Sequence, residues 1–158
     1  MFKTCTLVGK QCSGMTDLYG AMKFDSKWYP LIESGRKKCT TRLEQKASQG
    51  DIIRIGDLAI LVTSIERIPF RIACEERKDY WYRDGFDSVG EYRDELVRYY
   101  PVLENDMDRS VFVHRFRLIP DIENKADRWS DLPVDVKELV LTSMVHDYYS
   151  LRQKDGGL

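Results

Sequence analysis

The chain has 158 residues and a formal net charge of −1, and its 42% hydrophobic and 32% charged residues are typical of a soluble globular protein. This length predicts one domain with a tail, large enough to bury a real core. The near-zero net charge argues against bulk, non-specific binding of nucleic acid, but it leaves room for a local basic site.

Metal and disulfide chemistry is poorly supported by the composition. The chain has only two histidines, His114 and His146, and its cysteines, none in a Cys-x-x-Cys pair, are Cys5, Cys12, Cys39 and Cys74. Structural zinc normally needs four closely spaced nitrogen or sulfur ligands, so we expect no metal and no cofactor. The cysteines are typical of thiols in a reducing compartment. With no signal peptide and no long apolar run, we expect a cytoplasmic protein without a membrane span.

Local patterns predict the elements of the N-terminal half. A helix is expected over residues 27–34, with Ser26 as N-cap, Pro30 in the first turn and Gly35 just after its end. Strands are expected around it, with Gly56 and Asp57 as a hairpin turn. The predicted strands cover residues 3–9, 39–44, 50–56 and 58–68.

The C-terminal half begins with a helical turn and an irregular aromatic stretch that ends near Phe86. Ser88 and Glu91 form a capping box for a helix that stops at Pro101. Residues 109–119 alternate in polarity, which predicts a strand with one buried face and places His114 among core residues. The helices and antiparallel strands together predict an α+β fold with a small β-barrel.

A polar linker and an amphipathic helix close the chain. The helix carries an apolar stripe made of Val136, Leu139, Val140, Met144, Tyr148 and Leu151. We expect this stripe to pack against the main domain, and docking of a partner protein is the alternative.

The order of several short motifs resembles the ASCH domain family, whose β-barrel is related to the PUA fold. Gly35, Lys37, Thr40 and Arg42 reproduce the pattern Gly-x-Lys-x-x-Thr-x-Arg. The segments "GDIIRIG", "RDGFDSVGEY", "YYP" and "VFVHRFRLI" follow in the family's order. The resemblance covers residues 22–119, which leaves an N-terminal extension over 1–21 and a linker with a C-terminal helix over 120–158.

The resemblance implies several functions. The PUA-related fold implies RNA binding, some members resemble nucleases, and one small bacterial member hydrolyses the amide of N4-acetylcytidine with lysine, threonine and glutamate. Carried onto this sequence, the lysine falls on Lys37, the threonine on Thr40 and the acid on Asp84, an aspartate in place of the glutamate.

The spacing adds a geometric condition to this resemblance. In an extended strand Lys38, Thr40 and Arg42 share one face, and Thr41 points to the other. Lys37 joins Thr40 only if the chain turns near Gly35. Asp84 could act on the leaving amine, or pair with Lys37 or with Arg42. A salt bridge would hold Lys37 charged, whereas a base role requires it neutral.

Residues outside the motif complete the expected site. Arg36 and Lys38 are expected to hold phosphate at its mouth, and Tyr82 is either a packing residue or a stacking partner for a base. The sequence therefore predicts a cleft that binds RNA or a modified nucleoside. Hydrolysis of an N4-acylated cytidine, ribonuclease activity, and a non-catalytic interaction protein are the alternatives. The oligomeric state stays open.

Overall fold

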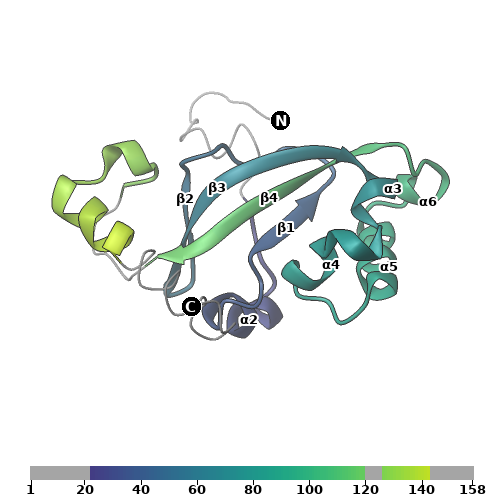
Figure 1. The fold of residues 1–158 in the computed structure, drawn as a ribbon, viewed down its shortest axis with the longest axis horizontal. Coiled ribbons are helices and arrows are strands. Elements are labelled where there is room, and N and C mark those ends of the chain that lie inside the picture. Colours follow the sequence, from purple (N-terminus) through teal and green to yellow (C-terminus); the bar gives the residue numbers. More distant parts are fainter. Residues whose placement is uncertain (1–21, 120–125, 143–158) are drawn as a thin grey trace, which may run out of the picture.

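The computed structural model describes residues 22–119 and 126–142. Its centre is an antiparallel sheet in the order β1-β4-β3-β2, in which β1 and β2 are the outer strands. The strands are β1 (Cys39–Arg42), β2 (Ile52–Ile55), β3 (Leu58–Pro69) and β4 (Ser110–Ile119). The sheet curls like half of a barrel (Figure 1), so the predicted α+β class and barrel-like sheet are confirmed.

Most helices gather at one end of this sheet (Figure 1). The α-helices are α2 (Tyr29–Glu33), α3 (Phe70–Ala73), α4 (Tyr80–Arg83), α5 (Val89–Tyr99) and α6 (Val102–Asn105). The 3-10 turns are η2 (Ser26–Trp28), η3 (Glu76–Lys78) and η4 (Trp129–Asp131). In the described part of the chain, no helix is both long and apolar enough to cross a membrane.

The long strands β3 and β4 hold the sheet together. They pair from Ala59 opposite Ile119 to Pro69 opposite Ser110, and a β-bulge lies between Val62 and Ser64. A bulge bends its strand and increases the local twist, which is consistent with the curl of the sheet. β1 is added on the other side of β4, with Thr40 opposite His114.

Two local predictions need correction. Asp25, not Ser26, caps the first turn, since its side chain accepts a hydrogen bond from the backbone of Lys27. β4 is buried on both faces, because Val113 packs under the helices while Phe116 packs on the opposite side. The alternation of polar and apolar residues predicted one buried and one exposed face, but tertiary contacts cover both faces.

The N-cap at Ser88 and the hairpin are confirmed, whereas the Glu91 side chain of the predicted capping box accepts from the backbone N–H of Asp87, at 3.4 Å. Ser88 Oγ accepts a hydrogen bond of 3.1 Å from the backbone N–H of Glu91, and α5 ends just before Pro101. β2 and β3 pair antiparallel across residues 56–57. The predicted strand over 3–9 lies outside the described residues.

The helix near the C-terminus is seen over residues 134–142. Val140 is buried and Val136 packs against the same cluster, which includes Ile52 of β2 and Leu61 of β3. The expected packing against the domain is therefore present at these two positions. Leu139, which was placed in the same stripe, is 54% exposed, so that assignment was wrong. Met144, Tyr148, Leu151 and His146 lie outside the described residues, and docking of a partner stays a prediction.

His114 provides a test of the core. The side chain is fully buried, and Nε2 accepts a hydrogen bond of 3.0 Å from the backbone N–H of Lys46. Burial lowers the pKa of His114 to about 4. An unfolded chain binds the proton near pH 6.5, so the free energy of unfolding should fall as the pH drops from 6.5 to 4, by up to about 1.4 kcal/mol per pH unit.

We expect the free energy of unfolding of His114→Gln to lack this pH dependence, since glutamine can accept the same hydrogen bond without titrating. Urea unfolding at several pH values checks it. The stability advantage of the wild type over the variant should shrink between pH 6.5 and 4. Parallel stability curves for the two proteins over this window would contradict the assignment.

Candidate functional site

The candidate site forms along the free edge of β1. After α2, Gly35 adopts a left-handed conformation with φ of +83°, and the backbone N–H of Lys37 donates to the carbonyl of Leu31 at 2.9 Å. Glycine tolerates this conformation, which other residues adopt at a cost. The turn that the sequence required near Gly35 is therefore present, and it brings the Lys37 side chain back to the strand.

Asp84 approaches the same edge from the other side. It lies at the end of α4, and Gly85 follows with φ of +103°. The Asp84 Oδ2 atom accepts a hydrogen bond of 3.0 Å from the backbone N–H of Thr41. A Cβ atom at Gly85 would lie 2.9 Å from the ring of Trp28, so a side chain is sterically excluded there.

Lys37 and Asp84 form a buried ion pair. The Lys37 Nζ atom lies 2.5 Å from Asp84 Oδ1, and it also donates to the carbonyl oxygens of Asp84 and Cys39 at 2.6 and 3.1 Å. The two side chains are 2% and 7% exposed. Three acceptors match the three protons of an ammonium group, so Lys37 is a charged donor with no lone pair to act as a base.

The ion pair also satisfies backbone groups of the outer strand. Lys37 donates to the carbonyl of Cys39, and Asp84 accepts from the N–H of Thr41. These are groups that an edge strand otherwise leaves unpaired. The pair therefore takes the place of a neighbouring strand at this position.

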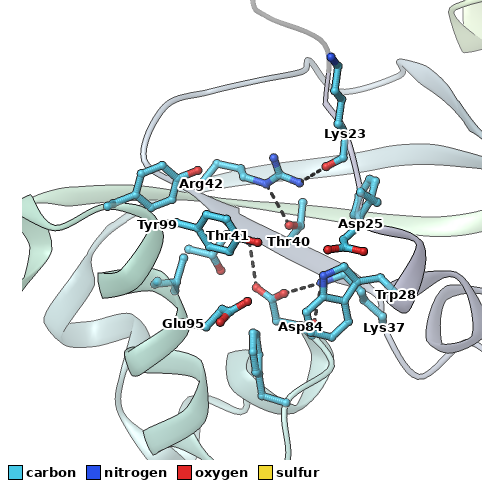
Figure 2. Close-up of a pocket in the computed structure, with 14 residues that line it drawn as sticks. Lys23, Asp25, Trp28, Lys37, Thr40, Thr41, Arg42, Asp84, Glu95 and Tyr99 are labelled. Carbon is cyan, nitrogen blue, oxygen red and sulfur yellow. Dashed lines mark hydrogen bonds and ion pairs between the residues drawn. The ribbon is translucent and has the colours of Figure 1, made fainter.

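A cavity of about 160 Å³ lies beside the pair (Figure 2). Five of its lining residues are aromatic, namely Phe24, Trp28, Phe86, Tyr99 and Tyr100. The others are Lys23, Asp25, Lys37, Thr40, Thr41, Arg42, Asp84, Glu95 and Leu96. The cavity thus opens between the segment before α2 on one side and helix α5 on the other.

Arg42 and Thr40 line the cavity from β1. Thr40 Oγ1 accepts a hydrogen bond of 3.2 Å from Arg42 Nε, and the Arg42 Nη2 atom donates to the carbonyl of Lys23 at 2.7 Å. The guanidinium lies 5.4 Å from the ring of Phe24. Because Thr40 Oγ1 accepts this hydrogen bond, its own hydroxyl proton remains available to donate to another acceptor.

Lys37, Thr40 and Arg42 of the motif and Asp84, which the resemblance added, all line this cavity, and their functional roles stay predictions. Arg36, Lys38 and Tyr82 are not among the residues that line this cavity. Lys38 is exposed, and Tyr82 is 50% exposed with the Arg36 guanidinium 4.0 Å above its ring. Whether these three contact a larger ligand stays a prediction.

Thr41 and Glu95 are cavity residues that the sequence did not reveal. Thr41 was placed on the far side of β1, yet it lines the cavity and its hydroxyl lies 2.8 Å from Tyr92 Oη. The cavity straddles the edge of β1, so side chains from both faces of the strand reach it. The sequence did contain a signal for Glu95. It follows Tyr92 by three residues, and this helical spacing places it on the side of the helix that carries Tyr92 and Leu96.

Glu95 is a carboxylate held in its charged form. Burial raises its pKa, but hydrogen bonds from Arg98 and Lys27 outweigh burial and leave the pKa below its usual value. The bond from Lys27, at 3.3 Å, joins the two walls of the cavity.

No group of three or more metal-ligating side chains is found within the described residues.

Comparison with known proteins identifies the fold. No family model and no curated protein matches the chain. Among solved structures, the hypothetical protein PH0355 is 23% identical, with a TM-score of 0.50 over 61% of this chain and 95% of that one. The chain has the fold of PH0355. At this identity the likeness extends to the fold and not to a function.

Other similar structures have lower scores. Protein PF0455 from Pyrococcus furiosus is 22% identical, with a TM-score of 0.46 over 61% of this chain and 93% of that one. An ASCH domain from Lactobacillus crispatus JV V101 is 16% identical, with a TM-score of 0.43 over 56% of this chain and 68% of that one. An ASCH domain is therefore among the solved structures similar to this chain.

The buried ion pair makes a prediction about stability. Lys37→Met should lower the free energy of unfolding by about 3–5 kcal/mol, because it leaves the Asp84 carboxylate buried without its cation. Adding Asp84→Asn should restore part of this loss. Urea unfolding of the three proteins measures both effects.

The exposed pair between Arg71 and Asp108 is the matched control, with side chains that are 58% and 70% exposed. Arg71→Met should change stability little, since exposed pairs contribute little. Equal losses in Lys37→Met and Arg71→Met would show that burial gives the Lys37 pair no special weight.

Proposed function

We propose that the cavity binds a small, flat, uncharged ligand of the nucleoside class. The observation that carries this proposal is the cavity itself, in which Lys37, Thr40 and Asp84 surround one space of about 160 Å³. A ligand-binding site is typically concave and lined by aromatic groups with a few directed polar ones. A flat basic surface would instead favour the phosphate backbone of RNA.

The charges of the cavity favour a neutral ligand. Its lining includes three basic residues, Lys23, Lys37 and Arg42, and three acidic ones, Asp25, Asp84 and Glu95. Lys37 is already neutralised by Asp84, and Glu95 by Lys27 and Arg98. A phosphate would therefore find little uncompensated positive charge inside, whereas a ring can stack on the aromatic walls.

The hydrogen-bonding groups of the cavity restrict the class of ligand further. The Thr40 hydroxyl and the Arg42 guanidinium are donors, and the Asp84 carboxylate keeps lone pairs besides those used by Lys37 and Thr41. Neighbouring donors and acceptors complement an edge with both C=O and N–H groups. Pyrimidine bases and N-acylated amines carry such an edge.

Trp28 offers a direct binding assay. Its ring lines the cavity and lies 4.6 Å from Lys37 Nζ, and the other tryptophans are Trp81 and Trp129. In a Trp81→Phe/Trp129→Phe background we expect saturable quenching by cytidine or N4-acetylcytidine at low salt. Thr40→Val should weaken this binding about tenfold, because it removes a buried hydrogen-bonding group.

Thr63→Val on β3 is the matched control, since the Thr63 hydroxyl donates to the carbonyl of Arg115, outside the cavity. It should bind like the parent. A short single-stranded RNA is titrated in parallel. Binding of RNA but of no nucleoside would favour the RNA alternative, and absence of saturable binding for all of them would remove the proposal.

Hydrolysis of an N-acylated nucleoside is a second candidate, supported by the convergence of Lys37, Thr40 and Asp84. Thr40 Oγ would attack the acyl carbon, its proton would pass through Lys37 to the departing amine as the C–N bond breaks, and water would then cleave the resulting ester to release the acid and restore the Thr40 hydroxyl. The geometry sets a condition. Lys37 must first pass a proton to Asp84 Oδ1, 2.5 Å away, before it can accept the proton of Thr40.

This candidate predicts release of acetate and cytidine from N4-acetylcytidine by the wild-type protein. Thr40→Val should abolish turnover, Thr40→Ser should retain a measurable part of it, and Thr63→Val should leave it unchanged. Chromatography of the products measures the rates. A wild-type protein that is inert on several acylated nucleosides would rule out this activity while leaving the binding proposal standing.

A further inference from the structure

The cationic segment 36–38 runs alongside the end of helix α4. Arg36 Nε donates to the carbonyl of Tyr82 at 3.2 Å, and the backbone N–H of Lys38 donates to that of Arg83 at 2.7 Å. Lys37 Nζ donates to the carbonyl of Asp84, and Arg36 Nη2 donates to that of Phe86 at 2.5 Å. Segment 36–38 thus donates hydrogen bonds to four carbonyl groups between residues 82 and 86.

These carbonyls lie where a helix ends, and that of Tyr82 accepts from the backbone N–H of Gly85 at 3.0 Å as well as from Arg36. The last turn of a helix leaves carbonyl groups without intrahelical donors. The chain then reverses at Gly85, whose left-handed conformation lies tight against Trp28. Asp84 is the C-cap residue of α4 and lies within this turn, so the position of its carboxylate depends on how the turn is held.

We propose that Arg36 is a positioning residue, which fixes the turn carrying Asp84 and so holds its carboxylate against Lys37 and Thr41. The two carbonyls that Arg36 binds lie on either side of Asp84 and Gly85. The guanidinium also stacks on Tyr82 at 4.0 Å and lies 3.6 Å from Asp87. All of these contacts of the Arg36 guanidinium are therefore with groups of the protein itself.

An arginine is suited to this role and a lysine is not. The planar guanidinium presents donors in a fixed fork, so one side chain can bind two carbonyls and stack on a ring at the same time. An ammonium on a flexible stem has no such fork. The sequence pattern alone suggested that Arg36 holds a phosphate, but its contacts favour the positioning role.

The inference concerns assembly of the ion pair and does not depend on the proposed ligand. Its direct reporter is the amide of Thr41, whose N–H donates to Asp84 Oδ2. The amide of Val62, which donates to the carbonyl of Asp51 at 2.9 Å, reports on the sheet away from α4. Hydrogen exchange by NMR follows both amides in the same sample.

The experiment compares Arg36→Ala, Arg36→Lys and Arg83→Ala with the wild type. Arg83 is the matched control, since it is a cation on α4 whose side chain pairs with Asp79 and is 43% exposed. In Arg36→Ala we expect the Thr41 amide to exchange about tenfold faster than in the wild type, the effect of weakening one buried hydrogen bond. Arg36→Lys should give a smaller increase, and Arg83→Ala none.

The Val62 amide separates positioning from general loss of stability. Faster exchange at Thr41 with unchanged exchange at Val62 supports the proposal. Equal acceleration at both amides, or an unchanged Thr41 amide in both Arg36 variants, overturns it. If Arg36→Ala does not fold, Arg36→Lys, which keeps the charge, decides by the same comparison. An equal effect of Arg83→Ala at Thr41 would also overturn it, because charge alone would then be sufficient.

Discussion

The buried ion pair between Lys37 and Asp84 is the interaction on which this site depends. It joins the turn after α4 to the free edge of β1, and it pairs backbone groups there that a neighbouring strand would otherwise bind. Neither charge is tolerable in that position alone, because an isolated buried ion is strongly destabilising. Two segments that are distant in the sequence are therefore required to stay together, and the cavity forms where they meet.

Local rules predicted much of the fold. The N-cap at Ser88, the hairpin at residues 56–57 and the strands around it depend on contacts within a few residues, which the sequence contains directly. The burial of β4 was not predictable in this way. Helices from residues 70–105 cover one of its faces and the segment before β1 covers the other, so alternation of residues was a poor guide.

The candidate site was predictable only in part. The motif pointed to Lys37, Thr40 and Arg42, and the resemblance pointed to Asp84. Strand alternation separates Thr41 from Thr40, but a cavity at the strand edge receives side chains from both faces, so alternation could not show that Thr41 lines it. Arg36 was predicted to contact a ligand because its charge is visible in the sequence, and the carbonyl groups that it binds could not be predicted in this way.

The ion pair also bears on the choice between binding and catalysis. The hydrogen bonds that hold the edge of β1 surround Lys37 Nζ with three acceptors, an arrangement that suits a donor in a binding site better than a base. A ligand that fills the cavity would expel water, and removal of water disfavours two charges relative to a neutral pair. A ligand N–H that donates to Asp84 would act in the opposite direction, because it stabilises the carboxylate. In the hydrolysis candidate the N–H of the amide must therefore point away from Asp84, whereas binding alone places no such condition on the ligand.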